Sequence, residues 1–303
     1  MTRRVGAVDI GTNSTRLLVA DVSDEGGIAE VERLLEITRL GDRVDADGRL
    51  SDAAVARVDA VLERYAARAE ELEAGTVLAV ATSAVRDAEN GREFLDETVA
   101  RHGFEPRLLT GEEEAEMTYR GVCSRAAVAE SVLICDIGGG STELILGGRE
   151  GVTDRASLDV GCVRMSERHL HADPPATAEL DALREEVAEA LPRRLTDAAR
   201  GLVGVAGTVT TLATIDMGLE VELPEVIDGH RLAAETVERL LAELAALPLD
   251  RRRVVRGLMP QRAPTIVAGA VILSAIVRAT GADAVVVSER DILHGAALAA
   301  ARV

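Results

Sequence analysis

The 303-residue sequence predicts an α/β protein. Short runs rich in Val, Ile and Leu alternate with long stretches whose apolar residues recur at helical spacing, as expected for strands joined by helices. A ten-residue segment also occurs twice, which suggests a duplicated folding unit. Hydrophobic residues make up 47% of the chain, so enough apolar surface is present for a large core.

The apolar runs predict seven strands, and the amphipathic stretches predict six helices. The strands are expected at residues 5–10, 16–22, 76–81, 132–136, 143–146, 202–206 and 284–288. The helices are expected at residues 52–71, 89–101, 112–122, 178–200, 232–247 and 264–279. Ser51 and Thr177 precede two of these helices and are candidate N-caps.

The repeated segment joins two strands in each copy. Residues 9–18 read Asp-Ile-Gly-Thr-Asn-Ser-Thr-Arg-Leu-Leu, and residues 136–145 read Asp-Ile-Gly-Gly-Gly-Ser-Thr-Glu-Leu-Ile. An ordinary hairpin with a glycine turn is the alternative interpretation. It does not require an Asp at the end of the first strand and Ser-Thr at the start of the second.

Both turns have the chemistry of phosphate-binding loops. Glycine leaves backbone N–H groups free to converge on an anion, and a hydroxyl adds a further donor. Two such loops facing each other across a cleft would hold a phosphate chain from both sides. The predicted phosphate-binding residues are Gly11, Thr12, Asn13, Ser14, Gly138, Gly139, Gly140 and Ser141. A third turn follows strand 202–206 and opens a helix, which adds Gly207 and Thr208.

Carboxylates flank the turns. Asp136 and Glu143 lie on opposite arms of the second hairpin, where their oxygens would suit Mg²⁺ or Mn²⁺. Asp9 ends the corresponding strand of the first copy and is a third candidate ligand. The alternative is that Asp136 forms the turn and Glu143 is a surface strand residue.

Composition excludes several other classes of protein. The net charge is −18, every basic residue is an arginine and aromatic residues make up 1%, which argues against nucleic-acid binding. The absence of lysine excludes Schiff-base lysines and the lysine of a P-loop. The three cysteines have no metal-binding spacing, and no apolar stretch is long enough to cross a membrane. We therefore expect a cytoplasmic protein.

Taken together, the motifs resemble those of the exopolyphosphatase/guanosine pentaphosphate phosphatase (Ppx/GppA) family, in its short form. The resemblance extends through Ala-Thr-Ser-Ala-Val-Arg-Asp-Ala at 81–88, Thr-Gly-Glu-Glu-Glu-Ala-Glu at 110–116 and Ser-Glu-Arg-Asp-Ile-Leu-His-Gly at 288–295. It implies two actin-like (ribonuclease H-like) domains with the active site in the cleft between them. They would span residues 1–120 and 121–303, with a last helix at about 292–303 returning to the first domain.

The resemblance also assigns catalytic roles. Glu114 aligns with the family's catalytic glutamate, which activates water, and Glu113 beside it is a possible substitute. Arg86 would neutralise charge on the transferred phosphoryl group. The alternatives are that these acids only stabilise a helix N-terminus, and that Arg86 forms an ordinary salt bridge to Asp87 or Glu89.

The implied reaction is metal-dependent release of orthophosphate from inorganic polyphosphate, by a homodimer. Hydrolysis of guanosine pentaphosphate is the close alternative, because both activities share these motifs. A kinase or ATPase of the same fold, a non-catalytic polyphosphate or nucleotide sensor and a scaffold remain further alternatives. The arginines at 251–253, with Arg256, are more typical of a solvated surface than of a polyanion track.

Overall fold

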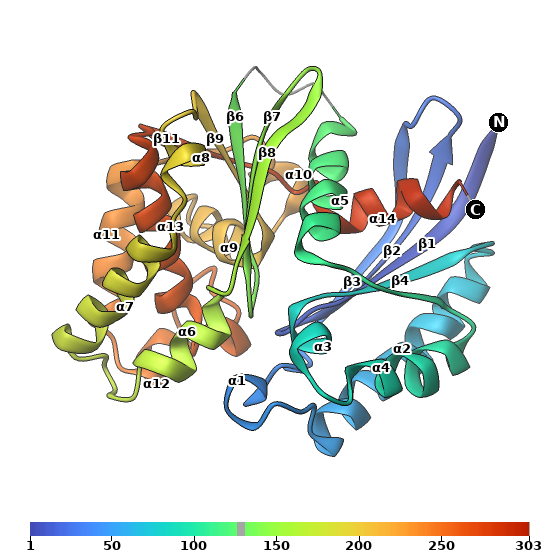
Figure 1. Cartoon of the computed structure of the whole chain (residues 1–303), viewed down its shortest axis with the longest axis horizontal. Helices are drawn as coiled ribbons and strands as arrows, with labels where there is room; N and C mark the ends of the chain where they lie inside the picture. Colours follow the sequence, from blue (N-terminus) through green and yellow to red (C-terminus); the bar gives the residue numbers. More distant parts are fainter. Residues whose placement is uncertain (126–130, 303) are drawn as a thin grey trace. The chain divides into compact units, whose positions relative to one another are not determined.

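The computed structural model describes residues 1–125 and 131–302, which form two compact units (Figure 1). The first unit comprises Met1–Ala127 and Arg290–Val303, and the second comprises Val128–Glu289. Each unit contains one mixed β-sheet covered by helices.

The sheet of the first unit has the strand order β3-β2-β1-β4-β5. Strand β2 runs antiparallel to both of its neighbours, whereas β1, β4 and β5 are parallel. The strands are β1 (Thr2–Ile10), β2 (Thr15–Ser23), β3 (Ile28–Glu36), β4 (Val77–Ala81) and β5 (Glu105–Leu108).

The sheet of the second unit has the order β10-β11-β9-β6-β7-β8. Strand β7 is antiparallel to β6 and β8, while β6, β9 and β11 are parallel. The strands are β6 (Val132–Ile137), β7 (Thr142–Gly148), β8 (Gly151–Leu158), β9 (Gly201–Val205), β10 (Arg231–Ala233) and β11 (Ala284–Val287). With the short β10 set aside, the order and strand directions match those of the first sheet. The predicted α/β class with a duplicated actin-like unit is therefore confirmed.

Helices cover both faces of the first sheet. Alternate residues of β1 point to opposite faces, so Val8 and Ile10 pack towards α2, and Val5 and Ala7 pack towards α14. The helices of this unit are α1 (Val44–Asp47), α2 (Asp52–Glu71), α3 (Ser83–Asp87), α4 (Gly91–Glu93), α5 (Gly111–Cys123) and α14 (Ile292–Ala300). Helix α5 includes residue 120, and α14 packs against α5 and β1.

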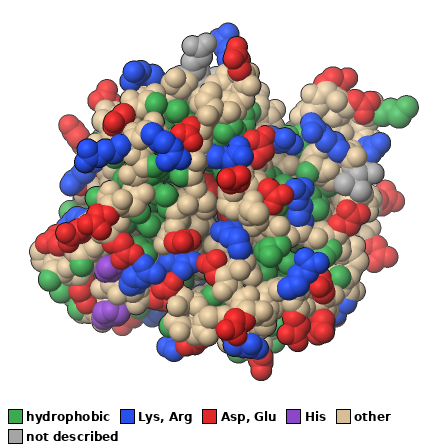
Figure 2. All heavy atoms as spheres, in the orientation of Figure 1, with side chains coloured by type: hydrophobic (Ala, Val, Ile, Leu, Met, Phe, Trp, Pro, Cys, Tyr) green, Lys and Arg blue, Asp and Glu red, His purple; other side chains and the backbone are tan. Residues whose placement is uncertain are grey.

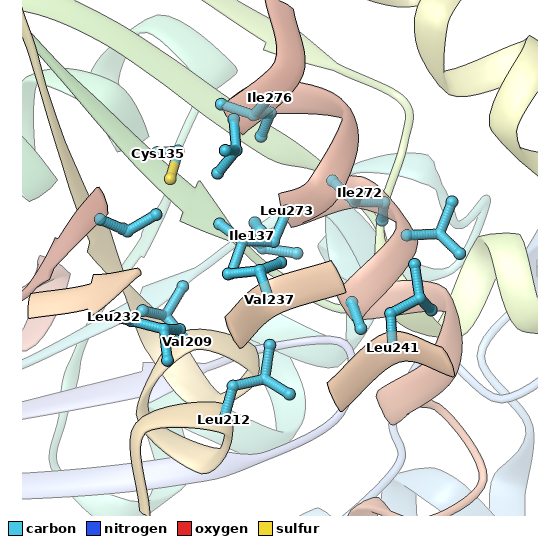
Figure 3. Packing of buried hydrophobic residues seen from close by; sticks show 14 of the residues in the cluster. Cys135, Ile137, Val209, Leu212, Leu232, Val237, Leu241, Ile272, Leu273 and Ile276 are labelled. Atoms are coloured by element: carbon cyan, nitrogen blue, oxygen red, sulfur yellow. The ribbon is translucent and has the colours of Figure 1, made fainter. Parts of the chain in front are cut away.

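The second unit has one large apolar core between its sheet and its helices (Figure 3). Cys135 and Ile137 of β6 meet Val209 and Leu212 of α9 and Ile272 of α13. The helices are α6 (Cys162–His169), α7 (Thr177–Ala190), α8 (Arg193–Thr196), α9 (Ala206–Asp216), α10 (Pro224–Ile227), α11 (Ala234–Ala245), α12 (Leu249–Arg252) and α13 (Ile266–Thr280).

Three predicted helices differ from those observed. The helix expected at 178–200 ends at Ala190, because Pro192 cannot continue it, and α8 follows. Residues 89–101 form α4 and then a π-helical and a 3₁₀ segment, Phe94–Val99 and Ala100–His102. The helix expected from 232 begins at Ala234, because the preceding residues form β10.

The two predicted N-caps had different outcomes. Ser51 Oγ accepts from the Ala54 N–H and caps α2, as predicted. Thr177 is instead the first residue of α7. The N-cap residue is Ala176, whose N–H donates to the carboxylate of Glu179 at 2.9 Å, the bond that the glutamate makes in a capping box.

Candidate functional site

The two glycine turns of the repeat have the same backbone structure. The Gly11 N–H donates to the Ser14 carbonyl at 2.9 Å, and the Gly138 N–H donates to the Ser141 carbonyl at 3.0 Å. In both turns a Cβ on the first glycine would lie 3.1 Å from that carbonyl oxygen. The sequence repeat is therefore also a structural repeat.

Neighbouring segments anchor the first turn. The Thr12 and Asn13 carbonyls accept from the N–H groups of Gly41 and Arg39, both at 2.9 Å. The buried Thr12 hydroxyl lies 3.0 Å from the hydroxyl of Ser83, which opens α3. Ser83 belongs to the motif at 81–88, so folding brings this motif into contact with the glycine turn of the 9–18 motif.

In the second unit, Asp136 and Glu143 are cross-strand partners on β6 and β7. Both are buried, with 7% and 1% of their surface exposed. Glu143 Oε1 accepts from Ser157 Oγ at 2.7 Å. Two acidic side chains directly opposite each other repel, and a bound cation would offset this.

These two carboxylates fit the implied metal. Mg²⁺ commonly takes one or two protein carboxylates and completes its coordination with water and substrate phosphates. A set of three or more His, Cys, Asp or Glu side chains arranged around one metal position does not occur within residues 1–125 and 131–302. The two carboxylates therefore suit a cation whose remaining coordination positions are filled by water and by the oxygens of a phosphate chain.

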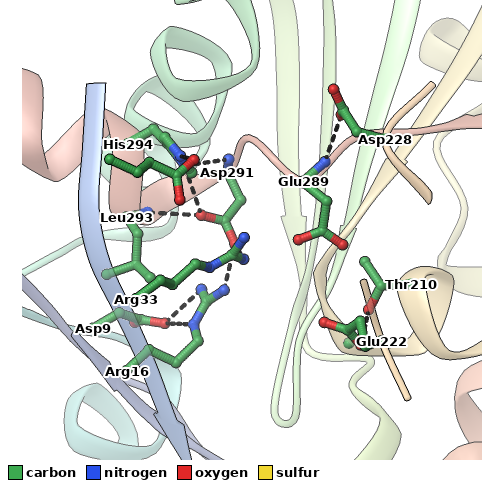
Figure 4. A network of polar contacts seen from close by, with 12 residues as sticks. Asp9, Arg16, Arg33, Thr210, Glu222, Asp228, Glu289, Asp291, Leu293 and His294 are labelled. Atoms are coloured by element: carbon green, nitrogen blue, oxygen red, sulfur yellow. Dashed lines mark hydrogen bonds and ion pairs between the residues drawn. The ribbon is translucent and has the colours of Figure 1, made fainter. Parts of the chain in front are cut away.

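In the first unit, Asp9 is engaged differently. Its cross-strand partner is Arg16, whose Nη2 and Nε lie 2.7 and 2.9 Å from Asp9 Oδ2. Arg16 also donates to Asp291, which begins α14 (Figure 4). Burial alone would lower the pKa of Arg16, but the charges of Asp291 and Asp9 outweigh it and raise that pKa. An arginine thus stands where the second copy has a carboxylate.

The carboxylate of Asp291 connects Arg16 to a histidine. Asp291 Oδ1 accepts from the Leu293 N–H at 3.0 Å and caps α14. His294, fully buried, has Nε2 at 3.0 Å from Glu30 Oε1 and Nδ1 at 3.5 Å from Asp291 Oδ1. Burial opposes a charge on this imidazole, but its bonds to Asp291 and Glu30 outweigh burial and raise the pKa of His294.

The predicted base and the predicted cation are in contact. Arg86, in α3 just after β4, places Nη1 3.2 Å from Glu114 Oε2 and 2.9 Å from the Leu109 carbonyl. Glu114 lies in the first turn of α5 and is 7% exposed. Arg86 therefore holds the Glu114 side chain in one orientation.

Glu113 has a different environment from Glu114. One of its oxygens accepts from the Thr110 N–H at 3.0 Å, while the Thr110 hydroxyl accepts from the Glu113 N–H, which forms a capping box. Its other oxygen accepts from Arg107 at 2.8 Å. These bonds, first of all that from the Thr110 backbone, lower the pKa of Glu113. Glu113 thus has the capping function that the sequence left open.

The third turn is covered by an arginine that the sequence analysis did not select. Arg262 Nη1 donates to the Gly207 carbonyl at 2.6 Å and to Thr211 Oγ1 at 2.9 Å. A Cβ on Gly207 would lie 2.4 Å from that Nη1, so only glycine permits the contact. Thr208 is buried, and a Cβ on Gly269 would lie 2.4 Å from its hydroxyl oxygen.

Two further polar contacts lie near this turn in the second unit (Figure 4). Thr210 Oγ1 donates to Glu222 Oε2 at 2.9 Å, and the Glu289 N–H donates to Asp228 Oδ1 at 3.0 Å. Arg262 also forms an ion pair with Glu222, at 3.5 Å. The turn is thus fixed by side chains from several segments of the unit.

The arginine run at 251–253 is not a continuous surface. Arg252 is buried and donates to the carbonyls of Leu244, Leu247 and Ala263 at 2.8–3.1 Å. Arg253 pairs with Asp250. Across the face drawn in Figure 2, arginines are interspersed with acidic side chains. Arg252 therefore belongs to the packing of the unit, whereas Arg251, Arg253 and Arg256 are exposed. Arg256 pairs with Glu220, so these three arginines form the solvated surface that the sequence favoured.

Comparison with known proteins identifies the family. The chain matches the model of the Ppx/GppA phosphatase family over residues 18–301. It is 38% identical to Exopolyphosphatase 2 of Mycobacterium tuberculosis, with 98% of each chain covered. It is 30% identical to Exopolyphosphatase 1 of Mycobacterium bovis, with 93% of this chain and 83% of that protein covered.

Solved structures agree over the whole length. The crystal structure of an exopolyphosphatase-like protein shares 33% identity at a TM-score of 0.92, covering 98% of this chain and 97% of that one. An exopolyphosphatase from Cytophaga hutchinsonii shares 26% identity at a TM-score of 0.88, covering 97% and 96%. The chain belongs to the Ppx/GppA phosphatase family.

None of the helices in the described part of the chain is long and apolar enough to cross a membrane.

Proposed function

We propose that the protein is an exopolyphosphatase, which hydrolyses the terminal phosphoanhydride bond of inorganic polyphosphate and releases orthophosphate. The observation that carries this proposal is the 38% identity, over nearly the full length of both chains, to Exopolyphosphatase 2 of Mycobacterium tuberculosis. The contact between Glu114 and Arg86 supports it, because it provides a base and a cation for phosphoryl transfer within one unit.

Glu114 is the proposed general base. Its carboxylate accepts a proton from water while the water oxygen bonds to the terminal phosphorus. The bridging P–O bond then breaks, and the shortened chain leaves with the bridging oxygen. Arg86 stabilises the charge on the terminal phosphate and fixes the orientation of Glu114.

The glycine turns supply uncharged donors. The N–H groups of residues 12–14 and 139–141 are proposed to bind phosphate oxygens, with Gly207 and Thr208 at a third turn. The N–H groups of Gly11 and Gly138 instead close their own turns. Asp136 and Glu143 would hold Mg²⁺ or Mn²⁺, which when bound neutralises phosphate charge. Asp9 is a less favoured ligand, because Arg16 already pairs with it.

The test is phosphate release by the purified protein with Mg²⁺, comparing short polyphosphate, long polyphosphate and guanosine pentaphosphate. Polyphosphate is expected to be hydrolysed most efficiently, and Glu114→Gln is expected to release no phosphate. Preference for guanosine pentaphosphate would favour the alternative activity of the family. Tight binding of polyphosphate without any release would identify a sensor.

We also expect a homodimer, as the family resemblance implies. Light scattering of the purified protein measures this directly, and a monomer mass at the assay concentration would contradict it.

A further inference from the structure

The glycine turn of the second unit is held by the start of α6. The Gly138 carbonyl accepts from the Cys162 N–H at 2.9 Å, and the Gly139 carbonyl accepts from the N–H groups of Val163 and Arg164 at 2.8 and 3.1 Å. The Gly140 carbonyl accepts from Arg164 Nε at 2.8 Å. Three consecutive carbonyls of the turn therefore point towards α6.

This arrangement determines where the N–H groups of the turn point. In a trans peptide the carbonyl and the following N–H lie on opposite sides of the bond. Because the carbonyls of 138–140 face α6, the N–H groups of Gly139, Gly140 and Ser141 face away from it. These are the donors assigned above to phosphate oxygens.

Close approach of the backbone makes the contact possible. A Cβ on Gly161, directly before α6, would lie 2.3 Å from the Gly139 oxygen and 2.5 Å from the Gly140 carbonyl carbon. Any side chain at Gly161 would push α6 away from the turn. The position thus requires glycine for space.

In the first unit the carbonyls of the glycine turn are also held by hydrogen bonds from a neighbouring segment, with one difference. There the Asn13 carbonyl, which corresponds to that of Gly140 in the repeat, accepts from the backbone N–H of Arg39 at 2.9 Å. In the second unit the donor is the side chain of Arg164. One contact of the second turn can therefore be removed by substitution without altering the main chain.

We propose that Arg164 is a positioning residue, whose Nε orients the Gly140–Ser141 peptide so that the Ser141 N–H binds a substrate phosphate oxygen. This proposal rests on the proposed exopolyphosphatase activity. The role requires a hydrogen-bond donor at the Nε position and does not require the positive charge.

Two substitutions separate these requirements. In Arg164→Gln the amide nitrogen stands the same number of bonds from Cα as Nε and can donate to Gly140, but the charge is lost. In Arg164→Met a methyl group occupies that position and cannot donate. Arg168→Met, one turn further along α6 and paired with Glu186, is the matched control.

The experiment measures kcat/KM for phosphate release from polyphosphate, together with the melting temperature. Misdirecting one donor is expected to lower kcat/KM about 10–100-fold in Arg164→Met. Arg164→Gln and Arg168→Met are expected to stay within about threefold of the wild type. Equal losses in Arg164→Met and Arg164→Gln would overturn the proposal and assign the effect to charge. An unchanged Arg164→Met would also overturn it.

A second readout does not depend on activity. In protein labelled with ¹⁵N-serine, the Ser141 amide resonance is expected to shift in Arg164→Met and to remain near its wild-type position in Arg164→Gln. Loss of the proposed function would appear as a wild type that releases no phosphate, whereas failure of the positioning role would appear as an unshifted Ser141 resonance in Arg164→Met.

Discussion

A single residue of the repeat changes the chemistry of each hairpin. At the same cross-strand position, Arg16 faces Asp9 in the first unit and Glu143 faces Asp136 in the second. The first pair neutralises itself, while the second places two negative charges side by side. Only the second hairpin therefore has the charge that favours a divalent cation.

The metal dependence of phosphate release tests this difference. Asp136→Asn and Glu143→Gln are each expected to raise the half-saturating Mg²⁺ concentration by about tenfold or more, because losing even an outer partner of a ligand costs about 10–100-fold in affinity. Titration of activity with Mg²⁺ gives the value. Asp154→Asn is the control, because Asp154 is an acid on β8 that is partly exposed and pairs with Arg194 of α8. Unchanged Mg²⁺ dependence in both variants would place the metal elsewhere.

Glu113 and Glu114 are adjacent, but substitution of Glu113 is expected to affect stability, whereas substitution of Glu114 is expected to affect phosphate release. Glu113→Ala removes half of the capping box of α5 and is expected to lower the free energy of unfolding by about 0.5–1 kcal/mol. Phosphate release is expected to persist, since Glu113 points to Thr110 and Arg107. Urea denaturation and the phosphate assay measure the two effects. Loss of release in a folded Glu113→Ala protein would make Glu113 the base.

At the scale of elements, hydrophobic periodicity predicted the buried strands and failed at exposed ones. Residues 5–10 of β1 and all of β6 are buried and were found as apolar runs. Strand β3 is half exposed and rich in glutamate, and β8 has similar exposure, so neither shows a strand pattern. Both pair along only one of their edges. Such strands form because they pair with a neighbouring strand of the folded sheet, and this pairing leaves little hydrophobic pattern in a single sequence.

Helices α5 and α14 pack closely against each other because each has a glycine at the contact. A Cβ on Gly121 would lie 1.8 Å from the Asp291 carbonyl oxygen, and a Cβ on Gly295 would lie 2.0 Å from that of Met117. Gly121→Ala is therefore expected to destabilise the protein by about 1–3 kcal/mol, as overpacking does. Urea denaturation measures the loss, with the exposed Arg120→Ala as control, expected to change stability by less than about 0.5 kcal/mol. A Gly121→Ala protein of wild-type stability would show that the helices can separate at no cost.

The buried histidine at the start of α14 predicts a pH dependence of stability. The charged and titratable groups around His294 are Asp291, Glu30, Arg16, Arg33 and Arg290. Because folding raises the pKa of His294, its contribution is complete below the unfolded value of about 6.5 and is lost as pH rises through the folded value. The urea midpoint is expected to fall over that interval.

His294→Gln provides the comparison, since glutamine does not titrate. Its urea midpoint is expected to lack the decrease above pH 6.5, whereas His171→Gln, at an exposed position, is expected to follow the wild type. A wild-type curve that does not change from pH 6 to pH 9 would contradict the charged state of His294.

At the scale of the whole molecule, the candidate site residues that could be selected from the sequence are those that lie within motifs. The glycine turns, Asp136 with Glu143, and Glu114 could be selected because each belongs to a short pattern. Arg262, Asp291 and Arg164 were not selected, because their partners lie at least 24 residues away and only folding brings them together. Asp291 precedes the apolar run of α14, so the sequence pattern could have predicted it as an N-cap. The same pattern could not have predicted its contact with Arg16.

The overall charge leads to a last prediction. At −18 the protein repels a polyanion, and this long-range repulsion is screened when the Debye length falls from about 30 Å at 0.01 M salt to about 8 Å at 0.15 M. At constant free Mg²⁺, kcat/KM for long polyphosphate is therefore expected to rise with monovalent salt over this interval, and to rise less for tripolyphosphate, which carries fewer charges. Sodium and tetramethylammonium chloride should act alike, since screening does not depend on the identity of the cation. A fall in kcat/KM for the long chain would instead show that local arginines dominate its capture, as in binding to cationic tracks.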